Sequence, residues 1–245
     1  MARAFRKSRS FSIDLTADAS MIAVDLLKVL KSKYDYKALS AITGIPVSTL
    51  TRYITGKTAP RSSKAERLLK NLLENINLAA LISESAEHNG DVDLAAVMLN
   101  PNMLKIIGAH VLEEFSGMKI TAILPLDVLS VPLASYLSTA ISRTMYLLSS
   151  EPVTADGHSI PVIFREAGRG AAKAYWLLVR RSCKNDSVLA ISAQTPDPYL
   201  FNALVEVLAE NGVALGGFFS VTAEEEKLRK LRIPPGVKRS YIVLA

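Results

Sequence analysis

The sequence predicts an all-α N-terminal unit followed by an α/β unit with a parallel sheet and flanking helices. Up to about residue 82, apolar side chains recur at the three- and four-residue spacing of amphipathic helices. From residue 119 onward, short β-type apolar runs alternate with helical segments and short loops, as in a parallel sheet whose faces helices cover. The nearly continuous apolar runs 187–192 and 213–221 fit central strands of such a sheet, which are buried on both faces.

Length and composition bound the possible classes of protein. A chain of 245 residues, 49% of them hydrophobic, is long enough for two domains with a sizeable core. The single cysteine, Cys183, excludes a disulfide framework and fits a reducing compartment. No apolar run reaches the roughly 18 residues of a membrane span, and no signal-peptide pattern opens the chain. We therefore expect a cytoplasmic protein with no membrane partner.

The charge is distributed unevenly between the two predicted units. Residues 1–82 contain 14 Lys and Arg against 6 Asp and Glu, whereas residues 83–245 contain 15 against 17. A polar, glycine-containing stretch lies between them, so we expect domains at 1–82 and 95–245 joined by a linker at 83–94. The basic excess of the first domain is typical of a module that binds a polyanion.

The first twelve residues are basic and contain no acidic residue. They include Arg6, Lys7 and Arg9 but no clear amphipathic period. Two interpretations stay open: a solvated tail, or an arm that follows the phosphate backbone or enters the minor groove of DNA. After this segment, an apolar stripe predicts a helix over residues 21–33, which would support the next two helices.

Residues 36–61 contain two short helical patterns that meet at Gly44. A glycine at this point supplies the positive φ that a sharp turn between helices needs, and Pro46 suits the first turn of the second helix. An apolar residue, Leu50, follows the glycine by six positions. This is the spacing of a helix-turn-helix. A further helix is expected over residues 64–82.

The same stretch resembles the phage-repressor (Cro and XRE) family of DNA-binding domains, down to the G-K-x-x-P ending at Gly56. Ser40 stands where that family usually has alanine. In this docking mode, the start of the second helix reaches base edges and the following loop contacts the backbone. The expected base-reading residues are Val47, Ser48, Thr49, Thr51 and Arg52, and the expected backbone contacts are Lys57, Thr58 and Arg61.

The second half should be helical over residues 94–115, with a break at Asn100-Pro101. Strands are expected at 119–124, 144–148, 160–164, 174–179, 187–192, 213–221 and 241–244. Helices are expected after the first of these strands, to about residue 140, and at 199–211.

This order, together with two loops, resembles the type I phosphoribosyltransferase fold. Residues 126–134 (LDVLSVPLA) are similar to the family's pyrophosphate loop, E-A-G-G-I-P-L-A, with Asp127 in the place of the acid. Residues 188–200 (VLAISAQTPDPYL) lie where the family has a buried strand, two acids and a phosphate-binding loop.

The departures from the family pattern concern the groups that carry its chemistry. Ser192 and Ala193 replace the two acids that engage the ribose hydroxyls of the phosphoribosyl donor. In the phosphate loop only Thr195 remains as a hydroxyl donor, while two prolines remove backbone N–H groups. Asp197 adds a negative charge where a phosphate would lie. The resemblance therefore implies a transferase scaffold without catalytic residues or a cofactor.

A ligand pocket at these loops remains a hypothesis. Its candidate residues are Asp127, Ser130, Ser192, Gln194, Thr195, Arg169 and Lys173. We expect either a neutral or cationic ligand or an anion held by Arg169, Lys173 or Arg180. The segment 168–170 with Lys173 reads as an ordinary turn, with a hood over a ligand as the alternative.

No metal site is expected, because His88, His110 and His158 lack ligand-like spacing. The sequence thus predicts a dimeric transcriptional regulator, and not an enzyme, that binds a palindromic site in double-stranded DNA. Its second domain would form the homodimer and sense a nucleotide-like effector, if there is one. An architectural or partner-binding protein and an active nucleotide-salvage transferase are the alternatives.

Overall fold

A computed structural model describes residues 19–88, 91–153, 159–165, 171–180 and 183–244. The predicted contacts Arg6, Lys7, Arg9 and Arg169 lie outside these ranges. Within the described part of the chain, no helix is long and apolar enough to cross a membrane.

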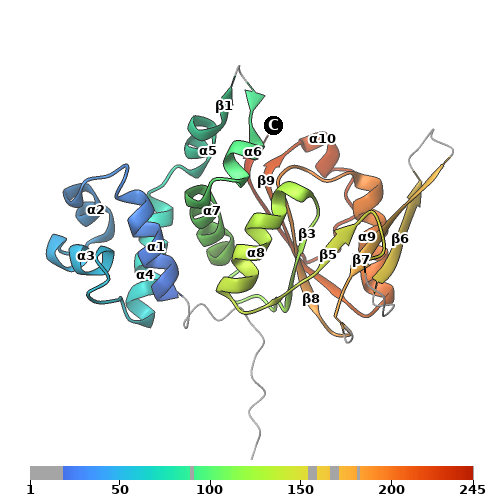
Figure 1. Cartoon of the computed structure of the whole chain (residues 1–245), viewed down its shortest axis with the longest axis horizontal. Helices are drawn as coiled ribbons and strands as arrows, with labels where there is room; N and C mark the ends of the chain where they lie inside the picture. The colour runs from blue at the N-terminus through green and yellow to red at the C-terminus, as the bar shows by residue number, and fades with distance from the viewer. Residues whose placement is uncertain (1–18, 89–90, 154–158, 166–170, 181–182, 245) are drawn as a thin grey trace, which may run out of the picture.

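The N-terminal part is a bundle of four short helices (Figure 1). Leucines from all four helices are buried in its core: Leu26, Leu39, Leu50 and Leu69. The bundle thus follows the predicted apolar stripes. Its helices are α1 (Ala19–Leu30), α2 (Tyr36–Thr43), α3 (Val47–Ile54) and α4 (Ser62–Glu74).

The helix expected over residues 64–82 is instead two helices, because α4 ends at Glu74 and α5 covers Leu78–Ala86. Two asparagines cause the break by bonding to the backbone. Asn75 donates from its side chain to the carbonyl of Asn71 at 2.8 Å, and the Asn77 side chain accepts from the amide of Ala80 at 3.0 Å. Asn77 thereby caps the start of α5.

The segment 83–94, predicted as a linker, contains the end of α5 and a two-stranded antiparallel pair, β1 (Glu87–His88) and β2 (Asp91–Val92). Two helices follow, α6 (Leu94–Met98) and α7 (Pro101–Glu114). They break where the sequence predicts, because Asn100 accepts from the amide of Asn102 at 2.9 Å and Pro101 occupies the first turn of α7.

A five-stranded sheet follows, in the order β10-β9-β8-β3-β4, and all its strand pairs are parallel, as predicted. All six residues of β8 are buried, because helices cover both faces. Phe219 packs on the side of α7 and Phe218 on the side of α9. The strands are β3 (Ala122–Pro125), β4 (Thr144–Met145), β8 (Ser187–Ser192), β9 (Ala214–Ala223) and β10 (Lys238–Leu244), and the remaining helical elements are η1 (Val128–Ser130), α8 (Val131–Ala140), α9 (Pro198–Glu210) and α10 (Glu225–Leu228).

The strands expected at 160–164 and 174–179 are present, but they do not join the parallel sheet. β5 (Leu147–Ser149), β6 (Ser159–Arg165) and β7 (Ala172–Leu178) form a separate antiparallel sheet in the order β5-β7-β6. Too few residues separate β6 from β7 for a parallel crossover, which needs a dozen or more. The burial along β6 also alternates: Val162 is buried and Ile163 is exposed, as in a strand covered on one face.

Helix α7 lies between the N-terminal bundle and the sheet (Figure 1). It packs against α1 and α4 on one side and against α8 on another. An ion pair of 3.4 Å joins Lys105 of α7 to Asp25 of α1. At Gly108 the helix lies so close to α8 that an added methyl group would overlap the ring of Tyr136.

We predict that Gly108→Ala lowers the free energy of unfolding by ~1–3 kcal/mol, because the new methyl group forces the Tyr136 ring to move. Urea unfolding measures the change. In a Tyr136→Ala background the same substitution should become neutral or stabilising, since alanine is favoured over glycine in a helix by up to ~1 kcal/mol. An equal loss in both backgrounds would contradict the proposed overlap.

Candidate functional site

The turn between α2 and α3 has the geometry that its glycine predicts. Gly44 adopts φ of 68° and donates its N–H to the carbonyl of Ser40 at 2.9 Å. The Asp35 side chain caps the start of α2 by accepting from the amide of Ala38 at 2.7 Å. Pro46 lies one position before α3, as its N-cap, and not within its first turn. The turn thus directs α3 away from α2 within three residues.

Helix α3 buries one face and exposes the other. Leu50 and Tyr53 are buried, whereas Val47, Ser48 and Arg52 are exposed. Two further predicted contacts, Thr49 and Thr51, are half-buried. The hydroxyl of Thr51 donates to the carbonyl of Val47 at 2.9 Å, so it is engaged within the helix.

A hollow of about 460 Å³ lies beside α3, between this helix, the following loop and the start of α4. It brings together four predicted residues: Thr49, Arg52, Thr58 and Arg61. Tyr53, Ser63 and Lys64 also line it, and they were not among the predicted contacts. The sequence position of Lys64 could have indicated its role. It follows Arg61 by three residues, and this spacing places both side chains near one face at the start of α4. Lys57 is exposed outside the hollow.

The hollow is strongly basic. Arg52, Arg61 and Lys64 line it without any carboxylate among the lining residues. In the part of the chain that the structure describes, none of these three cations forms an ion pair. A cluster of unneutralised cations beside an exposed helix attracts a polyanion such as a nucleic acid backbone.

The second group of predicted residues lies at the carboxyl ends of β3 and β8. There, Asp127 connects the two loops that resemble ligand-binding loops. One of its carboxylate oxygens accepts from the amide of Ser130 and the other from the amide of Ala193, both at 2.8 Å. Burial raises the pKa of Asp127, although these hydrogen bonds oppose the shift. Asp127 is therefore occupied as a structural acceptor.

Two hydroxyl groups of the β8 loop are engaged in the same way. Ser192 is fully buried and donates to the hydroxyl of Ser220 at 3.0 Å. Thr195 is buried and accepts from the amide of Glu224 at 2.8 Å. Gln194 is exposed between them. The two hydroxyls thus stabilise the loop through hydrogen bonds within the domain.

Asp197 occupies the start of α9. Its side chain accepts from the amides of Tyr199 and Leu200 at 2.9 and 3.0 Å. These are two of the N–H groups that a helix offers to an anion. A carboxylate of the chain itself therefore holds the position where a bound phosphate would lie.

The cavity beside these loops has a volume of about 300 Å³ and an apolar lining that includes Leu126, Val131 and Leu147. Of the predicted ligand residues, only Asp127 contributes to it. Lys173 is on β7, exposed. The expectation that Arg180 serves this site is wrong, because it pairs at 2.6 Å with Asp186, at the opposite end of β8. No group of three potential metal ligands occurs among the described residues.

We predict that Asp197→Ala lowers the free energy of unfolding by about 1 kcal/mol, because the first amides of α9 lose their acceptor. Asp197→Ser should stay close to the parent, since serine is also a good N-cap. Chemical unfolding of both variants measures the difference. Equal stability of the alanine variant and the parent would contradict the capping role.

Two curated relatives share part of the sequence. Both are described as a probable purine biosynthesis transcriptional regulator PurR, from two strains of Streptococcus pneumoniae. Each is 23% identical over 161 residues, which cover 64% of this chain and 58% of the relative. The match thus spans less than two thirds of the length of these relatives. No protein-family model matches the chain.

Solved structures show the fold of the C-terminal part. Adenine phosphoribosyltransferase from Thermoanaerobacter pseudethanolicus matches with a TM-score of 0.56 at 9% identity, over 68% of this chain and 99% of that one. The enzyme from Rhodothermus marinus matches with a TM-score of 0.58 at 12% identity, over 70% and 100%. The chain therefore contains an α/β domain with the type I phosphoribosyltransferase fold, preceded by a helical bundle.

Proposed function

We propose that the protein is a sequence-specific transcriptional regulator that binds double-stranded DNA through residues 1–82. The observation that carries this proposal is the basic hollow beside the exposed face of α3, with three cations and no lining carboxylate. The sequence match to relatives described as probable transcriptional regulators supports it. The bundle would belong to the phage-repressor type, whose spacing the segment 36–61 has.

In this proposal, α3 enters the major groove with its first turn. Val47, Ser48 and Thr49 would meet base edges, with Val47 suited to the methyl group of thymine. Arg52 would bind guanine or a phosphate, because its guanidinium offers a two-pronged donor. The remaining predicted contacts, Lys57, Thr58, Arg61 and those of the N-terminal arm (Arg6, Lys7 and Arg9), would hold the phosphate backbone. The hollow adds Lys64 to these backbone contacts.

We further propose that the α/β domain, residues 95–245, pairs two chains into a homodimer in the cytoplasm. A single small helical domain contacts little DNA, and the two-fold symmetry of a dimer matches a palindromic operator. An architectural protein would differ from this regulator by binding every duplex with similar affinity.

We predict that Arg52→Ala weakens binding to the operator by ~1–3 kcal/mol and relaxes the sequence preference of the protein. Lys57→Ala should weaken binding to all duplexes by a similar amount and lower the salt dependence of the affinity. Genome-wide mapping identifies the operator, and titrations at several salt concentrations measure both effects. Arg232→Ala, which removes an exposed cation paired with Glu206, is the control and should bind normally. Identical binding of Arg52→Ala and the parent to all duplexes would contradict the proposal.

We also propose that the phosphoribosyltransferase-like domain performs no phosphoribosyl transfer. The carboxylate pair that the family uses is replaced by Ser192 and Ala193, and Asp197 holds the helix amides that would bind the phosphate. A cavity with a largely apolar lining and one carboxylate, Asp127, suits a neutral or cationic molecule better than a polyphosphate.

Calorimetry should therefore detect no binding of the phosphoribosyl donor with magnesium that depends on Thr195 of the β8 loop, and the protein should show no turnover with nucleobases. An active adenine phosphoribosyltransferase, titrated in parallel, shows that the reagents are competent. Submicromolar binding of the donor that Thr195→Ala abolishes would contradict the proposal, because the loop would then still hold a phosphate.

A further inference from the structure

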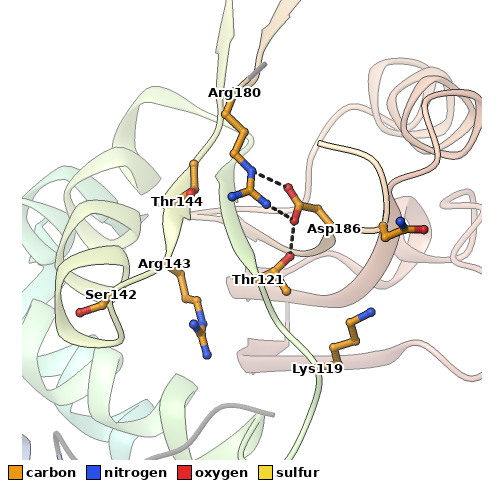
Figure 2. A pocket seen from close by; sticks show the side chains of 8 residues that line it. Lys119, Thr121, Ser142, Arg143, Thr144, Arg180 and Asp186 are labelled. Atoms are coloured by element: carbon orange, nitrogen blue, oxygen red, sulfur yellow. Dashed lines mark hydrogen bonds and ion pairs between the residues drawn. The ribbon is translucent and has the colours of Figure 1, made fainter. Parts of the chain in front are cut away.

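A second polar hollow lies at the opposite end of the parallel sheet from the loops described above. Its volume is about 310 Å³. Most of its residues lie just before β3, β4 and β8, while Thr144 is the first residue of β4 and Arg180 follows β7 (Figure 2). Three of the eight lining residues are cations and one is an acid. They are Lys119, Thr121, Ser142, Arg143, Thr144, Arg180, Asn185 and Asp186.

The single carboxylate of the hollow, Asp186, is fully engaged. One of its oxygens accepts from the hydroxyl of Thr121 at 2.9 Å and from Arg180 at 2.6 Å. The other accepts from Arg180 at 3.2 Å and from the hydroxyl of Tyr146. Asp186 therefore neutralises Arg180 and has no remaining capacity for another cation.

The other two cations remain without a carboxylate. In Figure 2 the side chains of Arg143 and Lys119 lie on either side of Thr121, apart from the Arg180 and Asp186 pair. Neither forms an ion pair within the described ranges. The Nε atom of Arg143 is also buried with no hydrogen-bond partner there. Buried donors nearly always have a partner, so this atom indicates a missing acceptor.

The backbone around the hollow is unusual as well. Among the described non-glycine residues, only Ser142 and Asn185 have a positive φ, of 51° and 70°. Both line this hollow. Such conformations concentrate at ligand sites, where the surrounding structure holds them in place. Here they bring a hydroxyl and an amide to the same space as the two cations.

We propose that this hollow binds the phosphate group of a phosphorylated small molecule. A phosphate monoester carries close to two negative charges at neutral pH, which matches the two cations left without a carboxylate, Lys119 and Arg143. The planar guanidinium of Arg143 suits a phosphate, and Ser142 and Thr144 supply hydroxyl donors. The volume lies at the lower end of the range for small-molecule pockets, about 300–1,000 Å³, so more than a free phosphate fits.

The backbone of DNA fits the hollow less well than a phosphorylated small molecule. Each of its phosphates carries one charge, and the duplex cannot enter a cavity of this size. The hollow is also separate from the basic hollow beside α3 and from the β8 loop. Its ligand binding can therefore be tested without DNA and without the phosphoribosyl donor.

The experiment titrates the full-length protein with inorganic phosphate, with adenosine 5′-monophosphate and with adenosine, using calorimetry. We expect saturable binding of the two phosphate-bearing probes and none of adenosine. Arg143→Gln and Lys119→Gln should each weaken this binding about tenfold or more, because each removes a charge-assisted contact. Lys230→Gln, which removes an exposed cation near α10, is the matched control and should bind like the parent.

Arg143→Lys should bind phosphate more tightly than Arg143→Gln but less tightly than the parent, since it keeps the positive charge and loses the planar guanidinium. Thermal unfolding shows that each variant is folded, and the exposed Lys119 gives a second variant if Arg143→Gln unfolds. The absence of saturable phosphate binding would overturn the proposal. So would equal affinity of the parent and both glutamine variants. If these variants instead weaken binding to duplex DNA while neither probe binds, the hollow belongs to the DNA interface and the proposal is wrong.

Discussion

The arrangement of the molecule depends on the burial of α7 between two layers. Helix α7 packs against α1 and α4 of the bundle, while its other side and α8 cover the sheet. Ile107 is fully buried, and the close approach at Gly108 allows the Tyr136 ring to fill the space between α7 and α8. A continuous apolar core therefore extends from the bundle to the sheet. The orientation of α3 relative to the sheet follows from side-chain packing, because the bundle is held against α7 directly.

Three sites on the molecule differ in the balance of their charged residues. The hollow beside α3 has three cations and no acid, which suits a long polyanion. The hollow before β3, β4 and β8 has three cations and one acid, which suits a small anion. At the carboxyl ends of the strands, Asp127 and Asp197 face amide groups of the chain itself. The same fold thus offers positive charge at one end of its sheet and carboxylates at the other.

Local patterns predicted most of the fold, and the long-range pairing of strands was the main exception. Glycine, proline and apolar spacing were enough for α2, α3 and the break before α7, because each depends on a few neighbouring residues. The antiparallel pairing of β6 with β7 in a separate sheet was not predicted, because an apolar run does not determine which strand it pairs with. The sequence pattern indicated Asp127 and Asp197 as residues of the two loops, but their hydrogen bonds to backbone amides were not predicted. It also missed the hollow around Arg143, whose residues come from four separate segments of the chain.

The capping of α9 by Asp197 has a consequence for how the domain responds to its surroundings. A carboxylate attached to the chain stays beside its amides at a local concentration that a diffusing metabolite does not reach. The amides at the start of α9 are therefore occupied by a group of the chain itself. Under the proposed function, a response to phosphorylated metabolites has to enter through another part of the domain.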